Sequence, residues 1–244
     1  SLRVDVEGLG DSEGDAGRNA KVANLYRPAL ADQVRAFLDQ LQERGLGPPF
    51  LLIGLCAGGY WAFQTAAQDE RVASAVLLNA GALVWDPELI SRRDARSLRL
   101  LAQRGGWRRM LRGEVSPARM LAVARAAART RWRAARRVLA RNLARFRSQP
   151  SQQPVDLMLN SIAAHGARLV LAFSAGEPLM LELEADGMLA RLGSWPNVAV
   201  VDLPAADHTV RPIVAQNAVH DLLDAELQRV LDAPLGAPAA RVAR

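Results

Sequence analysis

The sequence is poor in cysteine and lysine, with only Cys56 and Lys21, and it has no long apolar run. A single cysteine excludes an internal disulfide and a multi-cysteine zinc site. The apolar segments are far shorter than the roughly 18 residues of a membrane span, and no signal-peptide pattern is found at the start. Neither glycine (18) nor proline (13) is abundant enough for a collagen-like or low-complexity chain. We therefore expect a soluble, cytoplasmic protein with a sizeable core.

Charge is distributed unevenly along the chain, whose formal net charge is +6. Residues 91–150 contain 18 arginines and two acidic residues, Asp94 and Glu114, so this segment carries +16 and the remainder −10. The sequence therefore predicts a basic insert within an acidic body.

Short apolar runs alternate with segments of helical periodicity, which predicts an α/β domain with a mostly parallel sheet. The expected strands are Leu2–Val6, Phe50–Gly54, Val72–Asn79, Arg168–Ser174 and Val198–Leu203. Helical spacing of apolar residues predicts four helices. One begins at Pro28, and its apolar positions are Leu30, Val34, Leu38 and Leu41. Two more are expected over Gly58–Gln68 and Leu179–Leu192, and the last is expected near the end of the chain, with a buried face formed by Val219, Leu222, Leu223, Leu227 and Val230.

This alternation stops between residues 83 and 165, where no strand is expected. Within Pro117–Gln149 an apolar stripe with arginines on the other faces predicts a long amphipathic helix. The expected organisation is a core formed by residues 1–82 and 166–233, a helical insert at 83–165, and a flexible tail at 234–244.

The segment that runs from Phe50 to Gly59 carries the clearest chemical signal. An apolar strand leads into Gly54-Leu55-Cys56-Ala57-Gly58 and then directly into a helix. This pattern is typical of a nucleophile elbow, a sharp strand-to-helix turn that exposes its central side chain. Gly54 and Gly58 would let the neighbouring backbones approach, and the helix N-terminus would stabilise an anion beside the sulfur. A buried structural cysteine in a glycine-rich turn is the alternative.

With this segment the sequence resembles the α/β-hydrolases, with Cys56 in place of the usual serine, as in the dienelactone-hydrolase branch of that superfamily. The resemblance implies a nucleophile–acid–base order along the chain, which Cys56, Glu177 and His208 follow. It also implies that the amide of Ala57 is an oxyanion donor. Asp207 and Asp86 remain alternative acids.

The resemblance places the base in the loop after the last strand, and His208 lies there. Of the other histidines, His165 is expected at a helix end and His220 within the last helix, where each has a structural or solvated role.

The opening residues, from Asp5 to Ser12, resemble the strand and loop that precede the elbow in this family. In the family that segment belongs to about the fourth strand, so the resemblance implies an N-terminally incomplete sheet. The expectations for this segment are a fragment, a truncated gene product, or a natural variant whose fold a partner chain completes. The arginine-rich insert occupies the position of the family's helical cap.

The resemblance implies hydrolysis of an ester or thioester on a small-molecule acyl substrate, through a Cys56–His208–Glu177 triad and an acyl-enzyme, with no metal or other cofactor. The alternatives are an acyltransferase acting on a carrier-bound thioester, and a hydrolase-like binding module without catalysis. The basic insert favours a substrate linked to coenzyme A or a carrier protein, or else it is a solvated face. No nucleic-acid motif accompanies the arginines, so we do not expect a nucleic-acid ligand.

Overall fold

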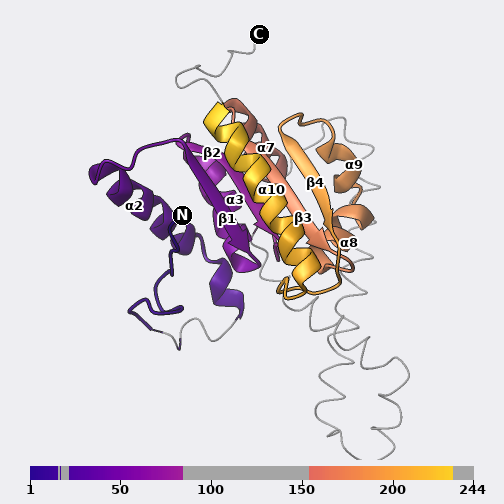
Figure 1. The fold of residues 1–244 in the computed structure, drawn as a ribbon, viewed down its shortest axis with the longest axis horizontal. Coiled ribbons are helices and arrows are strands. Elements are labelled where there is room, and N and C mark those ends of the chain that lie inside the picture. The colour runs from indigo at the N-terminus through magenta and orange to yellow at the C-terminus, as the bar shows by residue number, and fades with distance from the viewer. Residues whose placement is uncertain (16, 18–21, 85–153, 233–244) are drawn as a thin grey trace, which may run out of the picture. The chain divides into compact units, whose positions relative to one another are not determined.

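A parallel sheet of four strands is the framework of the part of the chain that the structure, a computed structural model, describes: residues 1–15, 17, 22–84 and 154–232. The strands are β1 (Phe50–Leu55), β2 (Val72–Leu78), β3 (Arg168–Ser174) and β4 (Val198–Leu203). They lie across the sheet in this same order, and each neighbouring pair is parallel (Figure 1). The predicted α/β class is confirmed.

Helices cover both faces of this sheet (Figure 1). The helical elements are the short 3-10 helix η1 (Val22–Tyr26), followed by α2 (Pro28–Glu43), α3 (Ala57–Gln68), α7 (Pro154–Ala164), α8 (Pro178–Ala185), α9 (Met188–Leu192) and α10 (Ile213–Asp232). Helix α10 packs on one face, where Val219 joins an apolar cluster with Val76 and Val170. The larger cluster on the other face joins α2, α3, α7, α8 and α9 to the sheet around Phe63 and Leu171.

The two central strands are buried along almost their whole length. In each of β2 and β3 every residue but one is buried, whereas the edge strands β1 and β4 are mostly half-exposed. A parallel strand covered by helices on both faces is apolar at consecutive positions rather than at alternate ones. This explains why the uninterrupted apolar runs in the sequence located both central strands correctly.

No strand forms at Leu2–Val6, so that expectation is wrong. Strand β1 pairs with β2 alone, and Leu2–Val6 does not add to its other edge, so the segment joins no ladder in the described sheet. A single strand outside a ladder is not stable. The backbone instead turns: Leu9 N donates to Val6 O at 3.0 Å, and Glu7 N donates to the side chain of Gln33 at 2.9 Å.

Two helices also differ from expectation. The helix expected over Leu179–Leu192 is divided into α8 and α9 by Gly187, whose φ of 69° is left-handed and ends a helical path. Leu227 was expected among the buried apolar residues of α10, and this is wrong, because Leu227 is 46% exposed. Its neighbour Glu226 is buried instead, at 2% exposed. Glu226 can be buried because its carboxylate accepts hydrogen bonds from Ser74 Oγ at 3.2 Å and Arg168 Nε at 2.9 Å.

The arginine-rich segment lies outside the described residues, as do the amphipathic helix expected within Pro117–Gln149 and the tail, so these expectations and the domain boundaries stay predictions. Residues 154–164, which the expected insert included, form α7, and its Leu159 and Ile162 are fully buried in the larger core cluster. In the described part of the chain, no helix has both the length and the apolarity needed to cross a bilayer.

Candidate active site

Cys56 forms the turn between β1 and α3 with a strained backbone. Its φ of 56° and ψ of −113° are a combination that non-glycine residues rarely adopt and that is found mainly at functional sites. The Cys56 amide donates to Leu78 O at 3.0 Å, and the Cys56 carbonyl accepts from Gly81 N at 3.3 Å. The turn is therefore fixed by hydrogen bonds to the end of β2 and the loop that follows it.

Glycines make this sharp turn sterically possible. A Cβ on Gly54 would lie 2.1 Å from the backbone carbon and oxygen of Gly58, so a larger residue would displace the start of α3. The expectation for Gly58 itself is wrong, because a Cβ there would meet no described atom within 4 Å. The second tight position is Gly59, where a Cβ would lie 3.0 Å from the Cβ of Ala80. The backbone of Gly58 therefore lies close to Gly54, but the lack of a Cβ on Gly58 is not required for this approach.

The sulfur of Cys56 lies at the N-terminal end of α3, where unpaired amides create a partial positive charge. Ala57 is the first residue of α3, so its amide has no acceptor within the helix. An oxygen anion formed on an acyl group attached to the sulfur would be stabilised by this amide. Cys56 as a whole residue is half-exposed.

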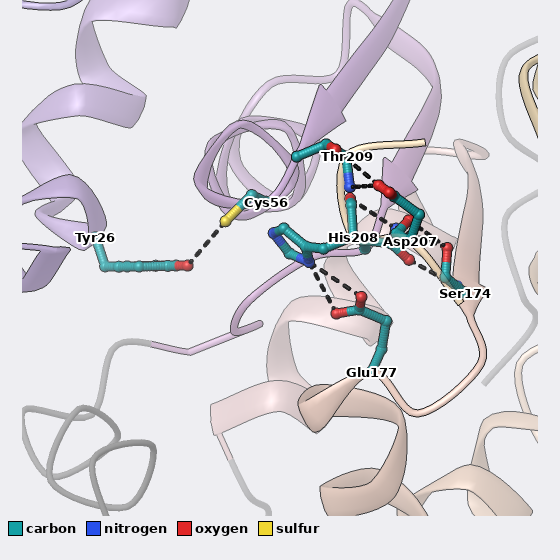
Figure 2. A network of polar contacts seen from close by, with 8 residues as sticks. Tyr26, Cys56, Ser174, Glu177, Asp207, His208 and Thr209 are labelled. Carbon is teal, nitrogen blue, oxygen red and sulfur yellow. Dashed lines mark hydrogen bonds and ion pairs between the residues drawn. The ribbon is translucent and has the colours of Figure 1, made fainter. Parts of the chain in front are cut away.

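His208 and Glu177 are in direct contact. His208 Nδ1 lies 3.0 Å from each of the two carboxylate oxygens of Glu177. Glu177 follows β3 as the N-cap of α8, and its side chain is 7% exposed, whereas that of His208 is 45% exposed. The imidazole lies between Glu177 and Cys56, with its other edge directed toward the sulfur (Figure 2). The described structure forms no hydrogen bond between Cys56 and His208, and such contacts are often loose before substrate binds.

The loop that carries His208 is fixed by two buried polar residues at the ends of the central strands. Asn79, directly after β2, donates to His208 O at 2.9 Å and to Ser174 Oγ at 3.0 Å. Ser174, the last residue of β3, donates from its hydroxyl to Asp207 O at 3.0 Å and from its amide to Asn79 Oδ1 at 2.7 Å. Asn79 and Ser174 are 0% and 1% exposed. The carboxyl ends of β2 and β3 therefore determine where the imidazole lies.

The alternative acid Asp207 makes other contacts. Its carboxylate accepts hydrogen bonds from Thr209 N at 2.8 Å, from Thr209 Oγ1 at 2.7 Å and from Arg211 Nε at 3.1 Å. The hydrogen bond from the Thr209 side chain, followed by that from Arg211, holds the pKa of Asp207 far below its usual range. These contacts direct the carboxylate of Asp207 away from the imidazole (Figure 2). Asp86, the other alternative, lies outside the described residues.

The remaining histidines are elsewhere. His165 follows the end of α7, and His220 is exposed on α10. Among the described residues, no group of three or more His, Cys, Asp and Glu side chains could hold a metal ion.

Sequence analysis missed three residues of the site: Asn79, Ser174 and Tyr26. A polar residue at the carboxyl end of each of two neighbouring buried strands was a usable signal for Asn79 and Ser174. Nothing in the sequence indicates that Tyr26, whose hydroxyl is 3.8 Å from Cys56 Sγ, lies beside the nucleophile.

A parallel sheet with a strained strand-to-helix turn, followed along the chain by a carboxylate and a histidine in contact, is the architecture of an α/β-hydrolase. The family model described as "Alpha/beta hydrolase family" matches residues 1–225. The chain belongs to the alpha/beta hydrolase family, which confirms the resemblance found in the sequence. A comparison with curated proteins gave no match.

Solved structures with a similar fold include VinJ, at 15% identity over 93% of this chain and 79% of that chain, with a TM-score of 0.50. A thermophilic esterase from Thermogutta terrifontis is 18% identical over 93% of this chain and 78% of that chain, with a TM-score of 0.45. The alpha/beta hydrolase GrgF from Penicillium sp. sh18 is 16% identical over 93% and 78%, with a TM-score of 0.48. At these identities the similarity concerns the fold alone.

Proposed function

We propose that the protein hydrolyses ester or thioester bonds, with Cys56 as the nucleophile, His208 as the base and Glu177 as the acid that orients the base. The observation that carries this proposal is the double 3.0 Å contact between His208 Nδ1 and the Glu177 carboxylate, on the side of the ring away from Cys56. Membership of the alpha/beta hydrolase family supports the same reaction class.

In the acylation half-reaction, the Cys56 thiol gives its proton to His208 Nε2, and the thiolate attacks the carbonyl carbon of the acyl substrate. The carbonyl π electrons move to oxygen, and the Ala57 amide stabilises the resulting oxyanion. When the tetrahedral intermediate collapses, the bond to the leaving alcohol or thiol breaks, and that group takes the proton from His208. The product is a thioester between the acyl group and Cys56.

In the second half-reaction, His208 takes a proton from water, and the hydroxide attacks the thioester carbonyl. Collapse of this intermediate releases the carboxylic acid and the Cys56 thiolate, and the proton on His208 restores the thiol. Glu177 holds the imidazole with Nδ1–H toward its carboxylate and stabilises the imidazolium formed in each half. A different acceptor in place of water would make the protein an acyltransferase by the same route.

The substrate class depends on charge as well as on chemistry. A thiolate suits thioesters and activated esters better than amides, because an amine leaves the tetrahedral intermediate less readily than the attacking thiolate does. The net charge of +16 over residues 91–150 favours an anionic acyl donor, such as one carried on coenzyme A or on a carrier protein. This second point depends on charge alone.

The first experiment is acylation by p-nitrophenyl acetate, followed by intact-mass measurement after rapid acid quench. We expect one acetyl group on Cys56 in the wild type and none in Cys56→Ala; because the chain has one cysteine, the adduct can be assigned directly. His208→Asn should slow acylation by about 100-fold or more. His220→Asn is the matched control, because His220 is exposed on α10, and it should leave the rate unchanged.

The result can separate the three functions. Acetylation followed by turnover in water supports hydrolysis, whereas acetylation that turns over only after a thiol or amine acceptor is added supports acyl transfer. A wild-type protein that is neither acetylated nor turns over the ester contradicts the proposal and leaves a binding module. Hydrolysis that persists in Cys56→Ala contradicts the role of Cys56 as the nucleophile.

A further inference from the structure

Tyr26 lies against the candidate nucleophile from the side opposite His208. Its hydroxyl oxygen is 3.8 Å from Cys56 Sγ, and the sulfur lies between the phenol and the imidazole (Figure 2). Tyr26 is the last residue of η1 and lies 30 positions before Cys56 in the sequence. No role in the half-reactions above has been assigned to this hydroxyl.

The position of Tyr26 is fixed by contacts other than the one to sulfur. Tyr26 is 1% exposed. Its ring packs edge-to-face on the ring of Tyr60 of α3, with the ring centroids 5.3 Å apart and an angle of 65° between the ring planes. The preceding residue is held to the same helix, because Trp61 Nε1 donates to Leu25 O at 2.6 Å. The hydroxyl is therefore presented to the sulfur by packing, and little conformational entropy is lost when it forms a hydrogen bond there.

The protonation states decide the direction of this hydrogen bond. In the thiol form either atom can be the donor. Once Cys56 has given its proton to His208, the sulfur can only accept, and a neutral phenol is then the donor. Hydrogen bonds to a charged acceptor are shorter and stronger than those between neutral groups, so the 3.8 Å contact should tighten in the thiolate form.

We propose that Tyr26 donates a hydrogen bond to the Cys56 thiolate and so stabilises both the thiolate–imidazolium pair formed when Cys56 gives its proton to His208 and the departing thiolate in deacylation. This inference rests on the proposed role of Cys56 as the nucleophile. The phenol keeps its proton throughout, so no bond to Tyr26 forms or breaks. Tyr26 is thus a second stabiliser of the anionic sulfur, beside the N-terminal end of α3.

The test is the rate of Cys56 alkylation by iodoacetamide as a function of pH, in the wild type, Tyr26→Phe and Tyr60→Phe. The chain has one cysteine, so the rate reports Cys56 alone. Tyr26→Phe keeps the ring and its packing but removes the donor, so we expect the midpoint of the profile to move up by about one pH unit, with an about tenfold lower rate below the midpoint. Tyr60→Phe removes the hydroxyl of the partner ring and should leave the profile within about twofold of the wild type.

The high-pH plateau distinguishes this role from a structural one. There the sulfur is fully ionised, and loss of a hydrogen bond makes it more nucleophilic, so the plateau for Tyr26→Phe should equal or exceed that of the wild type. A rate that falls equally at every pH would show a change in packing or access and would overturn the inference. The same conclusion follows if the Tyr26→Phe profile superimposes on that of the wild type.

The wild-type profile separates this inference from the proposed function. A wild-type Cys56 that is alkylated like an ordinary thiol, with no acetylation by p-nitrophenyl acetate, overturns both. A wild-type Cys56 that is acetylated and turns over, with a profile that Tyr26→Phe does not change, overturns only the role of Tyr26. The pH dependence of acetylation in Tyr26→Phe gives a second readout, which should move in the same direction as the alkylation profile.

Discussion

Replacement of Glu177 by glutamine separates charge from shape at the candidate acid. The side chain is 7% exposed and contacts His208 Nδ1 through both oxygens at 3.0 Å, and glutamine fills the same space without the negative charge. A hydrogen bond to a charged group contributes about 1.5–3 kcal/mol. Because about 1.36 kcal/mol corresponds to a factor of ten in rate, Glu177→Gln should lower kcat/KM for p-nitrophenyl acetate by about 10- to 160-fold.

The control is Asp207→Asn, which removes a carboxylate from the residue next to His208. Asp207 is held by Thr209 and Arg211 on the surface, and such exposed pairs contribute little. We expect its kcat/KM to stay within about threefold of the wild type, with thermal unfolding curves showing that both variants are folded. The assignment of Glu177 would be refuted if Glu177→Gln retained wild-type kcat/KM, or if Asp207→Asn lost as much activity as Glu177→Gln.

Three further predictions concern positions around the site and in the core. Gly54→Ala should reduce the free energy of unfolding in urea by at least about 1–3 kcal/mol, because its Cβ would lie 2.1 Å from Gly58, whereas Gly58→Ala should change it by less than about 1 kcal/mol. Asn79→Ala should cost about 1–3 kcal/mol of stability and lower kcat with little change in KM, since it frees the His208 loop; wild-type kcat would contradict the positioning role. The hydrogen bond from Arg71 holds the pKa of Asp69 below its usual range. The ionised Asp69 therefore contributes fully to stability above about pH 4, and this contribution is lost as the pH falls through the lowered pKa of the folded state. Asp69→Asn should therefore destabilise the protein at pH 7 and much less at pH 2, as equilibrium unfolding at the two pH values would show.

Features that depend on local sequence were predictable. The strands β2 and β3 were located from continuous apolar runs, and the start of α2 from Pro28, whose fixed φ suits a first helical turn. The strand-to-helix turn at Cys56 was recognised because glycine spacing, an apolar strand and a following helix are all local signals. The resemblance to the alpha/beta hydrolase family was recognised from the same segment, and the family model that matches residues 1–225 confirms it.

Features that depend on which segments meet in space were not predictable in the same way. Leu2–Val6 has strand-like composition but no described neighbouring strand. The buried face of α10 includes Glu226 because its carboxylate accepts hydrogen bonds from Ser74 and Arg168 on the sheet. The difference between Gly58 and Gly59 depends on where Ala80 lies after β2. Each outcome is decided by a partner that is distant in the sequence, and a single sequence does not identify such partners.

Backbone strain in the described part of the chain is concentrated in the segments that build the site. The non-glycine residues there with positive φ are Cys56 (56°), Asn79 (45°) and Val210 (55°). The first forms the elbow, the second holds the His208 loop, and the third lies two residues beyond His208. Each such conformation costs of order 1–3 kcal/mol and persists only where the surrounding contacts determine it. A cysteine that only filled space in a glycine-rich turn would not require strain in two other loops as well, so this distribution favours a site in which the three loops are positioned together.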